Sequence, residues 1–380
     1  MEKIIKKPEL VFIIYALIFG FILLFKVLPI QSVLDGGDHY QRAVEVSQGI
    51  MFAANKNSWV AGYSPVLYIF SALGLKIFNS FYAGRIFNLL VWIFLIASAI
   101  RITPVFKWLF VFTALMPASL FLGMTYSADS FSNAFSFLFF AYMFKLIYSK
   151  NEFSIPKDGT FLIILTTIGA FCKGALAPLL LMPIIKIKKH KYLILSILAF
   201  LGISLLGLWS SLNHGTIPDT VNPELNKSFI LHNPLSYLYI LFKTIITSIP
   251  GWAYGCIGFI GWVLMDKNLI VFSLVMYILA LYFIPAEVEI KPAQRLWAFV
   301  ILLLYTIMTC TLLFFIYTPY GSNEIYGVQP RYFIQIIPLL FIILNANKLP
   351  PPRKQFTDSF IKIMLIFLIF LLSYSCYIAI

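Results

Sequence analysis

Charged residues are scarce in this chain, and acidic residues are scarcer still. Of its 380 residues only 11% are charged, with 15 Asp and Glu against 28 Lys and Arg. Hydrophobic residues make up 61% and aromatic residues 17%, which excludes a soluble globular protein and indicates a polytopic membrane protein. A spanning helix needs about 20 apolar residues, so the chain has room for roughly ten or twelve spans.

Cysteine is also rare, and its positions lack the spacing of a metal or redox motif. The sequence has no zinc motif, no nucleophile elbow and no glycine-rich phosphate loop before a helix. The glycines of "GCIGFIGW" lie in an apolar context, where close helix packing explains them better. We therefore expect no metal site, no cofactor and four free, buried thiols. The four cysteines are Cys172, Cys256, Cys310 and Cys376.

The net charge of +13 does not indicate nucleic-acid binding, because the basic residues cluster in short loops between apolar runs. Placing these loops inside puts the N-terminus in the cytoplasm. It predicts an all-α polytopic membrane protein with about 11 transmembrane helices and outer interfacial helices. The chain, 1–380, forms a single transmembrane domain in this interpretation, with a first outer loop at 31–82 and a long outer segment at 213–268. Residues 234–265 are an interfacial or a re-entrant element. The predicted spans are 10–30, 85–100, 108–122, 130–147, 160–171, 174–185, 192–212, 269–285, 296–317, 332–346 and a last helix.

Four polar clusters fall on the outer side in this topology. The first contains Asp35, Asp38, His39 and Arg42, directly after the first span. If a helix begins near Asp38, then Asp38 and Arg42 are i,i+4 partners and Asp35 caps the helix. One interpretation is a capped, solvated surface helix. The other is a carboxylate general base, which takes the proton of an acceptor hydroxyl within hydrogen-bond reach.

The second cluster supplies another acid. The stretch "SADSFSN" places Asp129 and Asn133 at i,i+4 at the start of a helix. Ser127 or Asp129 is a helix cap in the simpler interpretation. In the functional one, Asp129 is a second carboxylate that faces the first cluster.

The last two clusters supply cations. Lys173 lies between two short apolar helices, either as a side chain that reaches the interface or as a phosphate ligand. Arg331 opens an inward helix in "GVQPRY", beside Gln329 and Tyr332. It is either an anchor to lipid headgroups or a bidentate phosphate ligand.

In their order, these clusters resemble the C-type membrane glycosyltransferase superfamily (GT-C). That superfamily has an acidic motif in its first outer loop, an interfacial helix, an Arg that opens the second span and a second Asp motif. Here these are matched by "DGGDHYQRA", "GYSPVLYIFSALG", Arg85 and "YSADSFSN". With "CKG", "GCIGFIGW" and "GVQPRYF", the pattern also resembles a bacterial subgroup of predicted membrane proteins of unknown function, related to Gtr-type enzymes that modify surface polysaccharide. The resemblance spans residues 8 to about 347.

The resemblance implies an enzyme that takes a sugar from an undecaprenyl-phosphate-linked donor, with no metal required and with inversion. The acceptor is a surface glycan or a lipid-linked glycan, on the outer face of the bacterial cytoplasmic membrane. Asp35 matches the leading acid of the family pattern "D-E-x-x-H", but Gly36 stands where a second acid often lies. The catalytic base is therefore Asp35 or Asp38. Lys173 and Arg331 would hold the donor phosphate. The other substrate-binding residues that it implies are His39, Arg42, Arg85, Asp129, Asn133, Gln329 and Tyr332.

Three other classes compete with this interpretation. A transporter or flippase of lipid-linked sugars also needs outer cations, but it should carry deep polar residues or broken helices in paired halves. An O-antigen polymerase or ligase typically depends on Arg-rich outer loops, and residues 213–233 contain no Arg. A structural membrane protein explains neither the four clusters nor their order.

Overall fold

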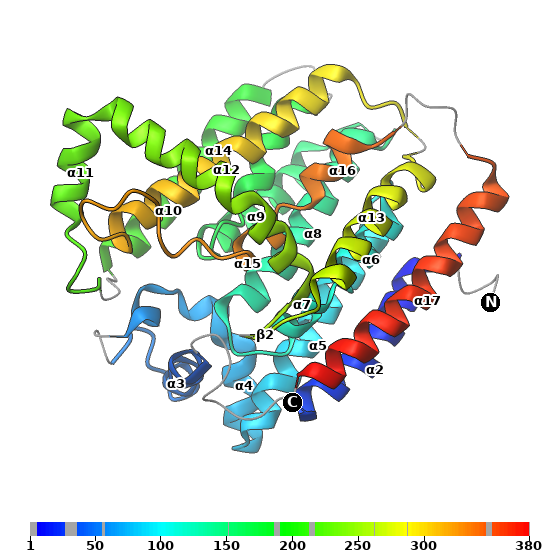
Figure 1. Cartoon of the computed structure of the whole chain (residues 1–380), viewed down its shortest axis with the longest axis horizontal. Helices are drawn as coiled ribbons and strands as arrows, with labels where there is room; N and C mark the ends of the chain where they lie inside the picture. The colour runs from blue at the N-terminus through cyan, green and yellow to red at the C-terminus, as the bar shows by residue number, and fades with distance from the viewer. Residues whose placement is uncertain are drawn as a thin grey trace.

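The computed structural model is almost entirely helical (Figure 1). A two-residue hairpin pairs β1 (Phe259–Ile260) with β2 (Val263–Leu264) in antiparallel register. The residues that the structure describes are 6–26, 36–54, 58–150, 152–185, 191–212, 217–261, 263–286, 288–346 and 352–379.

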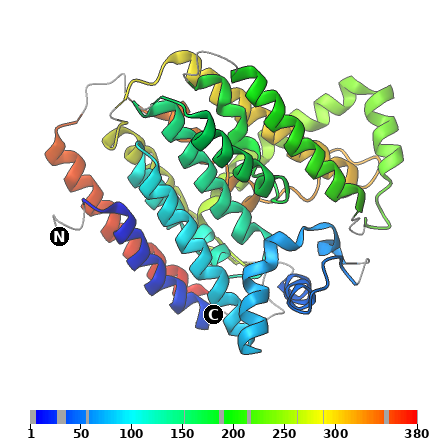
Figure 2. The ribbon, with the colours of Figure 1, turned by 180° about the vertical axis from the view of Figure 1, so that it is seen from behind.

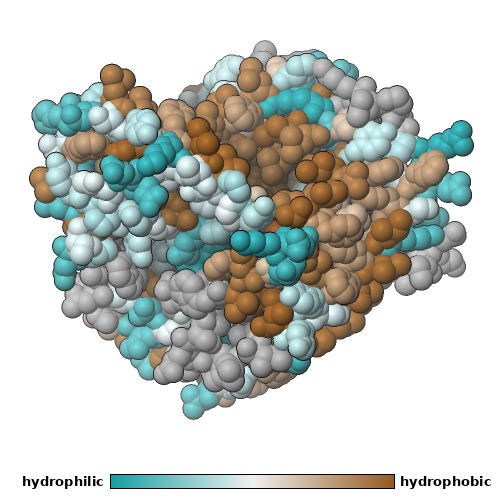
Figure 3. Space-filling view, viewed as in Figure 1, coloured by the Kyte–Doolittle hydropathy of each residue, from teal (hydrophilic) through white to brown (hydrophobic). Residues whose placement is uncertain are grey.

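Seven of the described helices are long and apolar enough to cross a membrane. Their lengths match the roughly 30 Å of hydrocarbon that a bilayer presents. Large exposed hydrophobic side chains lie on six of these helices, all except the central one at residues 128–148, and Figure 3 shows one such apolar surface. The seven are α2 (Pro8–Lys26), α5 (Phe81–Ile102), α8 (Ala128–Tyr148), α10 (Lys191–Leu212), α12 (Pro234–Gly258), α14 (Pro292–Ile316) and α17 (Lys354–Ile378).

Several expected spans are shorter or interrupted helices. Residues 108–122 are divided between α6 (Lys107–Ala114) and α7 (Pro117–Gly123), because Pro117 cannot donate to the preceding turn. Residues 332–346 are likewise divided between α15 (Arg331–Ile334) and α16 (Pro338–Leu344). The 269–285 span is α13 (Lys267–Phe283).

The two short helices expected at 160–185 form a hairpin. The first is α9 (Thr160–Ala170) and the second is the 3-10 helix η4 (Ala177–Ile184). A short π-helical turn, η3 (Ile155–Gly159), leads into α9. Within 234–265, expected as an interfacial or re-entrant element, residues 234–258 form one of the seven long apolar helices. Their placement in or along the membrane stays a prediction.

The remaining short elements form two separate groups (Figures 1 and 2). Helix α11 (Pro223–His232), capped by Asn222, packs on α12 and α14. Helix α3 (Gly36–Ser47) packs on the segment that follows it in the chain. Two 3-10 turns follow α3, and the second leads directly into α4. Their bounds are η1 (Trp59–Gly62), η2 (Pro65–Tyr68) and α4 (Ile69–Phe78).

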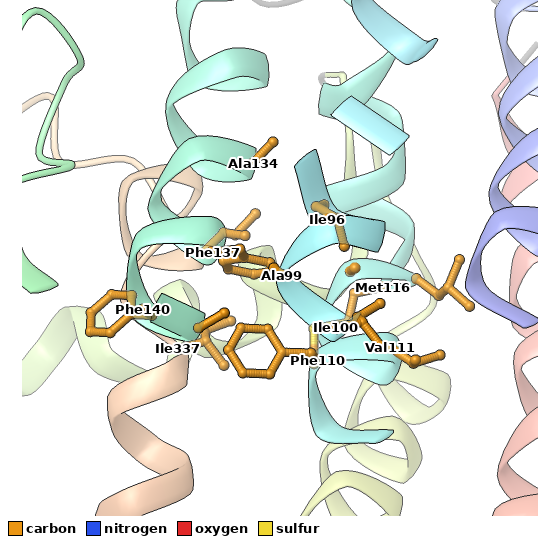
Figure 4. Packing of buried hydrophobic residues seen from close by; sticks show 14 of the residues in the cluster. Ile96, Ala99, Ile100, Phe110, Val111, Met116, Ala134, Phe137, Phe140 and Ile337 are labelled. Atoms are coloured by element: carbon orange, nitrogen blue, oxygen red, sulfur yellow. The ribbon is translucent and has the colours of Figure 1, made fainter. Parts of the chain in front are cut away.

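The core lies where α5 and α8 pack against α6, α7 and α16 (Figure 4). Phe110 of α6 is fully buried, and its ring meets those of Phe137 and Phe341 edge-on. Edge-to-face rings add about 0.5–1.5 kcal/mol per pair beyond the area that they bury. This aromatic packing holds α8 in the middle of the bundle, and α8 carries the first polar residues of the candidate site.

Candidate functional site

The site begins at the first turn of α8. Ser127 caps this helix, because its hydroxyl accepts a hydrogen bond from the Asp129 N–H at 3.2 Å. Ser127 is therefore the cap, and the Asp129 carboxylate is available for other partners. Asn133 lies one turn further along the same face and is only 3% exposed. Neither amide atom of Asn133 has a hydrogen-bond partner.

Arg331 meets Asp129 from the start of α15. Its Nε lies 2.8 Å from Asp129 Oδ2, and both side chains are buried. The preceding residue, Pro330, is seated against α12. A Cβ atom at Gly255 would come within 3.0 Å of the Pro330 ring, and the Cys256 thiol donates to the Pro330 carbonyl at 3.2 Å. Gly255 and Gly258 of "GCIGFIGW" thus have a packing function, as expected, whereas Gly261 lies in the turn of the hairpin with φ +63°.

Lys173 completes the charged group from the turn between α9 and η4. Its Nζ lies 3.7 Å from Asp129 Oδ1 and 3.7 Å from the centroid of the Tyr332 ring. It also donates to the Tyr63 hydroxyl at 3.3 Å. Burial by itself lowers the pKa of Lys173. The Asp129 carboxylate opposes this effect, and with it the pKa lies above its ordinary value. Lys173 therefore stays charged.

His39 of α3 lies beside this charged group. Its Nδ1 is 2.7 Å from the Tyr68 hydroxyl, and its ring stacks on that of Tyr63 with 5.8 Å between centroids. Burial and the charge of Arg331 lower the pKa of His39 to about 3, against the opposing effect of Asp129. The imidazole is therefore neutral at neutral pH.

Asp38, one of the two predicted catalytic acids, is half-buried on the same helix. Its Oδ1 accepts a hydrogen bond from the Ser58 hydroxyl at 3.3 Å. Burial raises the pKa of Tyr68 well above its ordinary value, and the charges of Asp129 and Asp38 raise it further. Asp38 and Asp129 therefore both lie in the electrostatic surroundings of Tyr68, whose hydroxyl is bonded to His39. The other predicted acid, Asp35, lies outside the described residues.

Two cations meet at one carboxylate in this arrangement. Lys173 and Arg331 both pair with Asp129, while His39 is neutral. Asp129, Lys173 and Arg331 come from three parts of the chain, each more than forty residues from the next. Charges away from bulk water interact strongly, so two neighbouring cations favour an anionic ligand that both can contact.

Three predicted binding residues also have contacts within the protein. Arg42 is 1% exposed, and its ion pair is with Glu45 at 2.9 Å, not with Asp38. The same guanidinium donates to the carbonyls of Ile50, at 3.1 Å, and Met51. These contacts fit the role of holding the loop after α3.

Arg85 and Gln329 also make hydrogen bonds with the backbone near them. The buried Arg85 donates from Nε to the Met124 carbonyl at 3.0 Å, and α5 begins four residues earlier than expected, at Phe81. Gln329 is half-buried before α15, and its carbonyl accepts the Tyr332 N–H at 3.1 Å. A substrate role for these residues stays a prediction.

Sequence reasoning missed four residues that enclose the charged group. Tyr63 and Tyr68 contact Lys173 and His39, as described above. Tyr305 donates to the Tyr332 carbonyl at 2.9 Å and accepts a hydrogen bond from Gln335. Gly174 (φ +71°) leaves room for both, since a Cβ atom there would meet Tyr305 and Gln335. Aromatic residues are too common in this chain to mark these positions.

All four cysteines are free and buried, as expected. Within the described residues, no group of three or more His, Cys, Asp or Glu side chains is placed to hold a metal ion. The expectation that no metal or cofactor is required stays a prediction.

The apolar helices and the buried charged site together define a polytopic membrane protein. The chain belongs to a family of predicted membrane proteins, DUF2142, whose model matches residues 54–340. This stretch contains Asp129, Lys173 and Arg331 but not α3. No curated protein and no solved structure matches the chain.

Proposed function

We propose that this protein is a membrane glycosyltransferase that takes a sugar from a polyprenyl-phosphate-linked donor. The acceptor in this proposal is a cell-surface glycan or a lipid-linked glycan. The observation that carries the proposal is the meeting of two cations, Lys173 and Arg331, at the carboxylate of Asp129. A phosphate attached to a lipid is the anion that a site within apolar helices is suited to bind.

Lys173 and Arg331 have different roles in this proposal. Arg331 is held by Asp129 at 2.8 Å, whereas Lys173 is 3.7 Å away and its side chain is 27% exposed. The donor phosphate therefore approaches Lys173 first, and Arg331 adds the second positive charge. Two cations stabilise the charge that develops on the phosphate as it leaves.

A carboxylate supplies the base. The proton of the acceptor hydroxyl passes to Asp38 or Asp35 as the oxygen attacks the anomeric carbon. The bond from that carbon to the phosphate oxygen breaks, and polyprenyl phosphate leaves with the bonding electrons. Attack from the face opposite the phosphate inverts the anomeric centre. His39 and Tyr68 line the approach, and Asn133 offers an unpaired amide for a sugar hydroxyl.

The proposed topology has eleven crossings of the bacterial cytoplasmic membrane, with the N-terminus in the cytoplasm and the site on the outer face. Four of these crossings are made by short helices. They are α6 together with α7, α9 alone, η4 alone, and α15 together with α16. The basic loops between apolar runs support this assignment. Since α12 is also long enough to cross, labelling of single cysteines placed at either end of α12 tests this count most directly.

The test of the proposed activity is sugar transfer by the purified protein in nanodiscs, with a panel of polyprenyl-phosphate sugars. We expect turnover in the wild type, loss in Asp38→Asn or Asp35→Asn, and loss in Lys173→Met. Asp219→Asn is the matched control, because Asp219 is an exposed acid outside the site. If both Asn variants at positions 35 and 38 retain full turnover with unchanged melting temperature, the assignment of the base is wrong.

A transporter or flippase of lipid-linked sugars is the second candidate, and one observation favours it. Two helices are interrupted, one between α6 and α7 and the other between α15 and α16. Arg331 is the first residue of α15. Transporters commonly bind substrates at interrupted helices. Reconstituted protein that moves a labelled lipid-linked sugar across vesicles, but turns over no donor, would establish this alternative.

A further inference from the structure

Three aromatic rings form a layer beside the charged group, and we call them the aromatic platform. They are Phe52 in the loop after α3, Phe171 at the end of α9 and Trp209 near the C-terminal end of α10. Phe52 stacks on Trp209 with 6.1 Å between centroids and 8° between planes. Phe171 meets the same Trp209 ring edge-on, also at 6.1 Å. The proposed reaction mechanism uses none of these rings.

The aromatic platform is joined to the cation Lys173 at two points. Phe171 lies two residues before Lys173 in the same turn. The Trp209 indole N–H donates to the Gly62 carbonyl at 3.0 Å, and the next residue is Tyr63, whose hydroxyl accepts from Lys173. A ligand bound to Lys173 therefore has these three rings within reach.

On its other side, the platform continues into apolar surface that a membrane covers. Only 11% of the apolar window of α10 is buried inside the protein, and Phe200 on this helix is 75% exposed. Phe52 itself is 53% exposed, and its neighbour Met51 is held by the buried Arg42. A Trp near the end of a spanning helix lies at the level where headgroups meet hydrocarbon. An apolar route thus leads from the bilayer to Lys173.

We propose that the aromatic platform binds the first apolar units of a polyprenyl chain whose phosphate lies on Lys173. The inference rests on the proposed function for the identity of the lipid, a long-chain alkenyl phosphate. A sugar ring is the weaker occupant, because sugar binding needs hydrogen-bond partners around the stacked ring. The indole N–H of the platform is already used by the Gly62 carbonyl.

The test is photocrosslinking in nanodiscs, with a polyprenyl phosphate that carries a diazirine in its first isoprene units. We expect crosslinks on Met51, Phe52, Phe171 or Trp209, and we expect excess unlabelled polyprenyl phosphate to suppress them. A phosphatidylcholine with a diazirine in its acyl chain is the control for bulk lipid, and its labelling should resist that competition. Polyprenol without phosphate should compete poorly, because it lacks the group that Lys173 holds.

A pair of variants makes the test specific. Phe52→Ala should weaken competed crosslinking about tenfold, since it removes the phenyl surface that the bound chain would cover. Phe200→Ala removes an equal side chain from the lipid-facing part of α10 and should change nothing. Trp209→Phe keeps an aromatic ring at this position and should retain most of the crosslinking. It provides a second test if Phe52→Ala does not fold.

The outcomes separate this proposal from the proposed function. Competed crosslinks at the platform without any sugar transfer would support the lipid site and overturn the glycosyltransferase proposal. Sugar transfer with crosslinks spread evenly over the exposed helices, and no effect of competitor or of Phe52→Ala, would overturn the lipid site alone.

Discussion

Arg331 and Asp129, 202 positions apart in the sequence, form a buried ion pair in which Nε lies 2.8 Å from Oδ2. Neither charge has much contact with water, so each depends on the other. Removing one partner of such a pair leaves a buried, uncompensated charge, which costs about 3–5 kcal/mol. The pair thus sets the stability of the site as well as its charge.

A double-mutant cycle tests this dependence. We expect Asp129→Asn to lower the free energy of unfolding by about 3–5 kcal/mol, because both Arg331 and Lys173 lose their counter-charge. Asp129→Asn combined with Arg331→Gln should be less destabilised than the sum of the two single variants. Thermal unfolding of the purified variants in detergent measures both effects. Additive losses would mean that the two side chains do not act as a pair.

Two glycines of α12 provide a matched comparison of packing. A Cβ atom at Gly255 would come within 3.0 Å of Pro330, whereas one at Gly251 would meet nothing within 4 Å. Gly255→Ala should therefore push α12 away from Pro330, displace Arg331 and cost about 1–3 kcal/mol. Gly251→Ala should be neutral or slightly stabilising, since Ala favours the helix by about 1 kcal/mol. Melting temperatures and sugar transfer are the measurements, and equal effects of the two substitutions would contradict the packing argument.

The buried His39 predicts a loss of stability on acidification. Its pKa is about 3 in the folded protein and 6.5 in the unfolded chain, so between these values only the unfolded state binds the proton. The free energy of unfolding should therefore be intact above pH 6.5. It should fall by up to about 1.4 kcal/mol per pH unit below that value. Melting curves from about pH 7.5 to about pH 4.5 should show a shallower decline in His39→Gln than in the wild type. Parallel declines in the two proteins would contradict this account of His39.

From the sequence it was possible to predict the membrane class, the start of α8 and three polar residues that the fold brings together, Asp129, Lys173 and Arg331. The aromatic residues around these three were not predicted. Composition alone indicates apolar helices, and the Ser127 cap is visible as a local motif. Prolines begin both second halves, at Pro117 of α7 and Pro338 of α16, but apolar composition alone predicts continuous spans there. Likewise, Tyr63 and Tyr68 are not distinguishable from the other tyrosines until the fold brings them to His39.

For Arg42, the predicted partner is wrong, while its substrate role stays a prediction. The i,i+4 spacing in one polar stretch predicted a partner at Asp38. In the fold, the guanidinium lies under the loop after α3, where Glu45 and two backbone carbonyls use its donors. An i,i+3 acid and a turn two residues beyond the helix are both visible in sequence. Which of the two acids Arg42 contacts depends on the path of the loop.

Helix α8 holds α15 at two levels. Asp129 binds Arg331 at one turn, and two turns further along the Ser136 hydroxyl donates to the Gln335 carbonyl at 3.1 Å, where the helix is interrupted. These two attachments make α8 and α15 the fixed wall of the site. The turn of Lys173 reaches both of these helices, through its ion pair with Asp129 of α8 and its contact with the Tyr332 ring of α15. The spacing between the two cations of the site is therefore set by backbone that α8 and α15 hold in common, and a change in either helix alters both cations together.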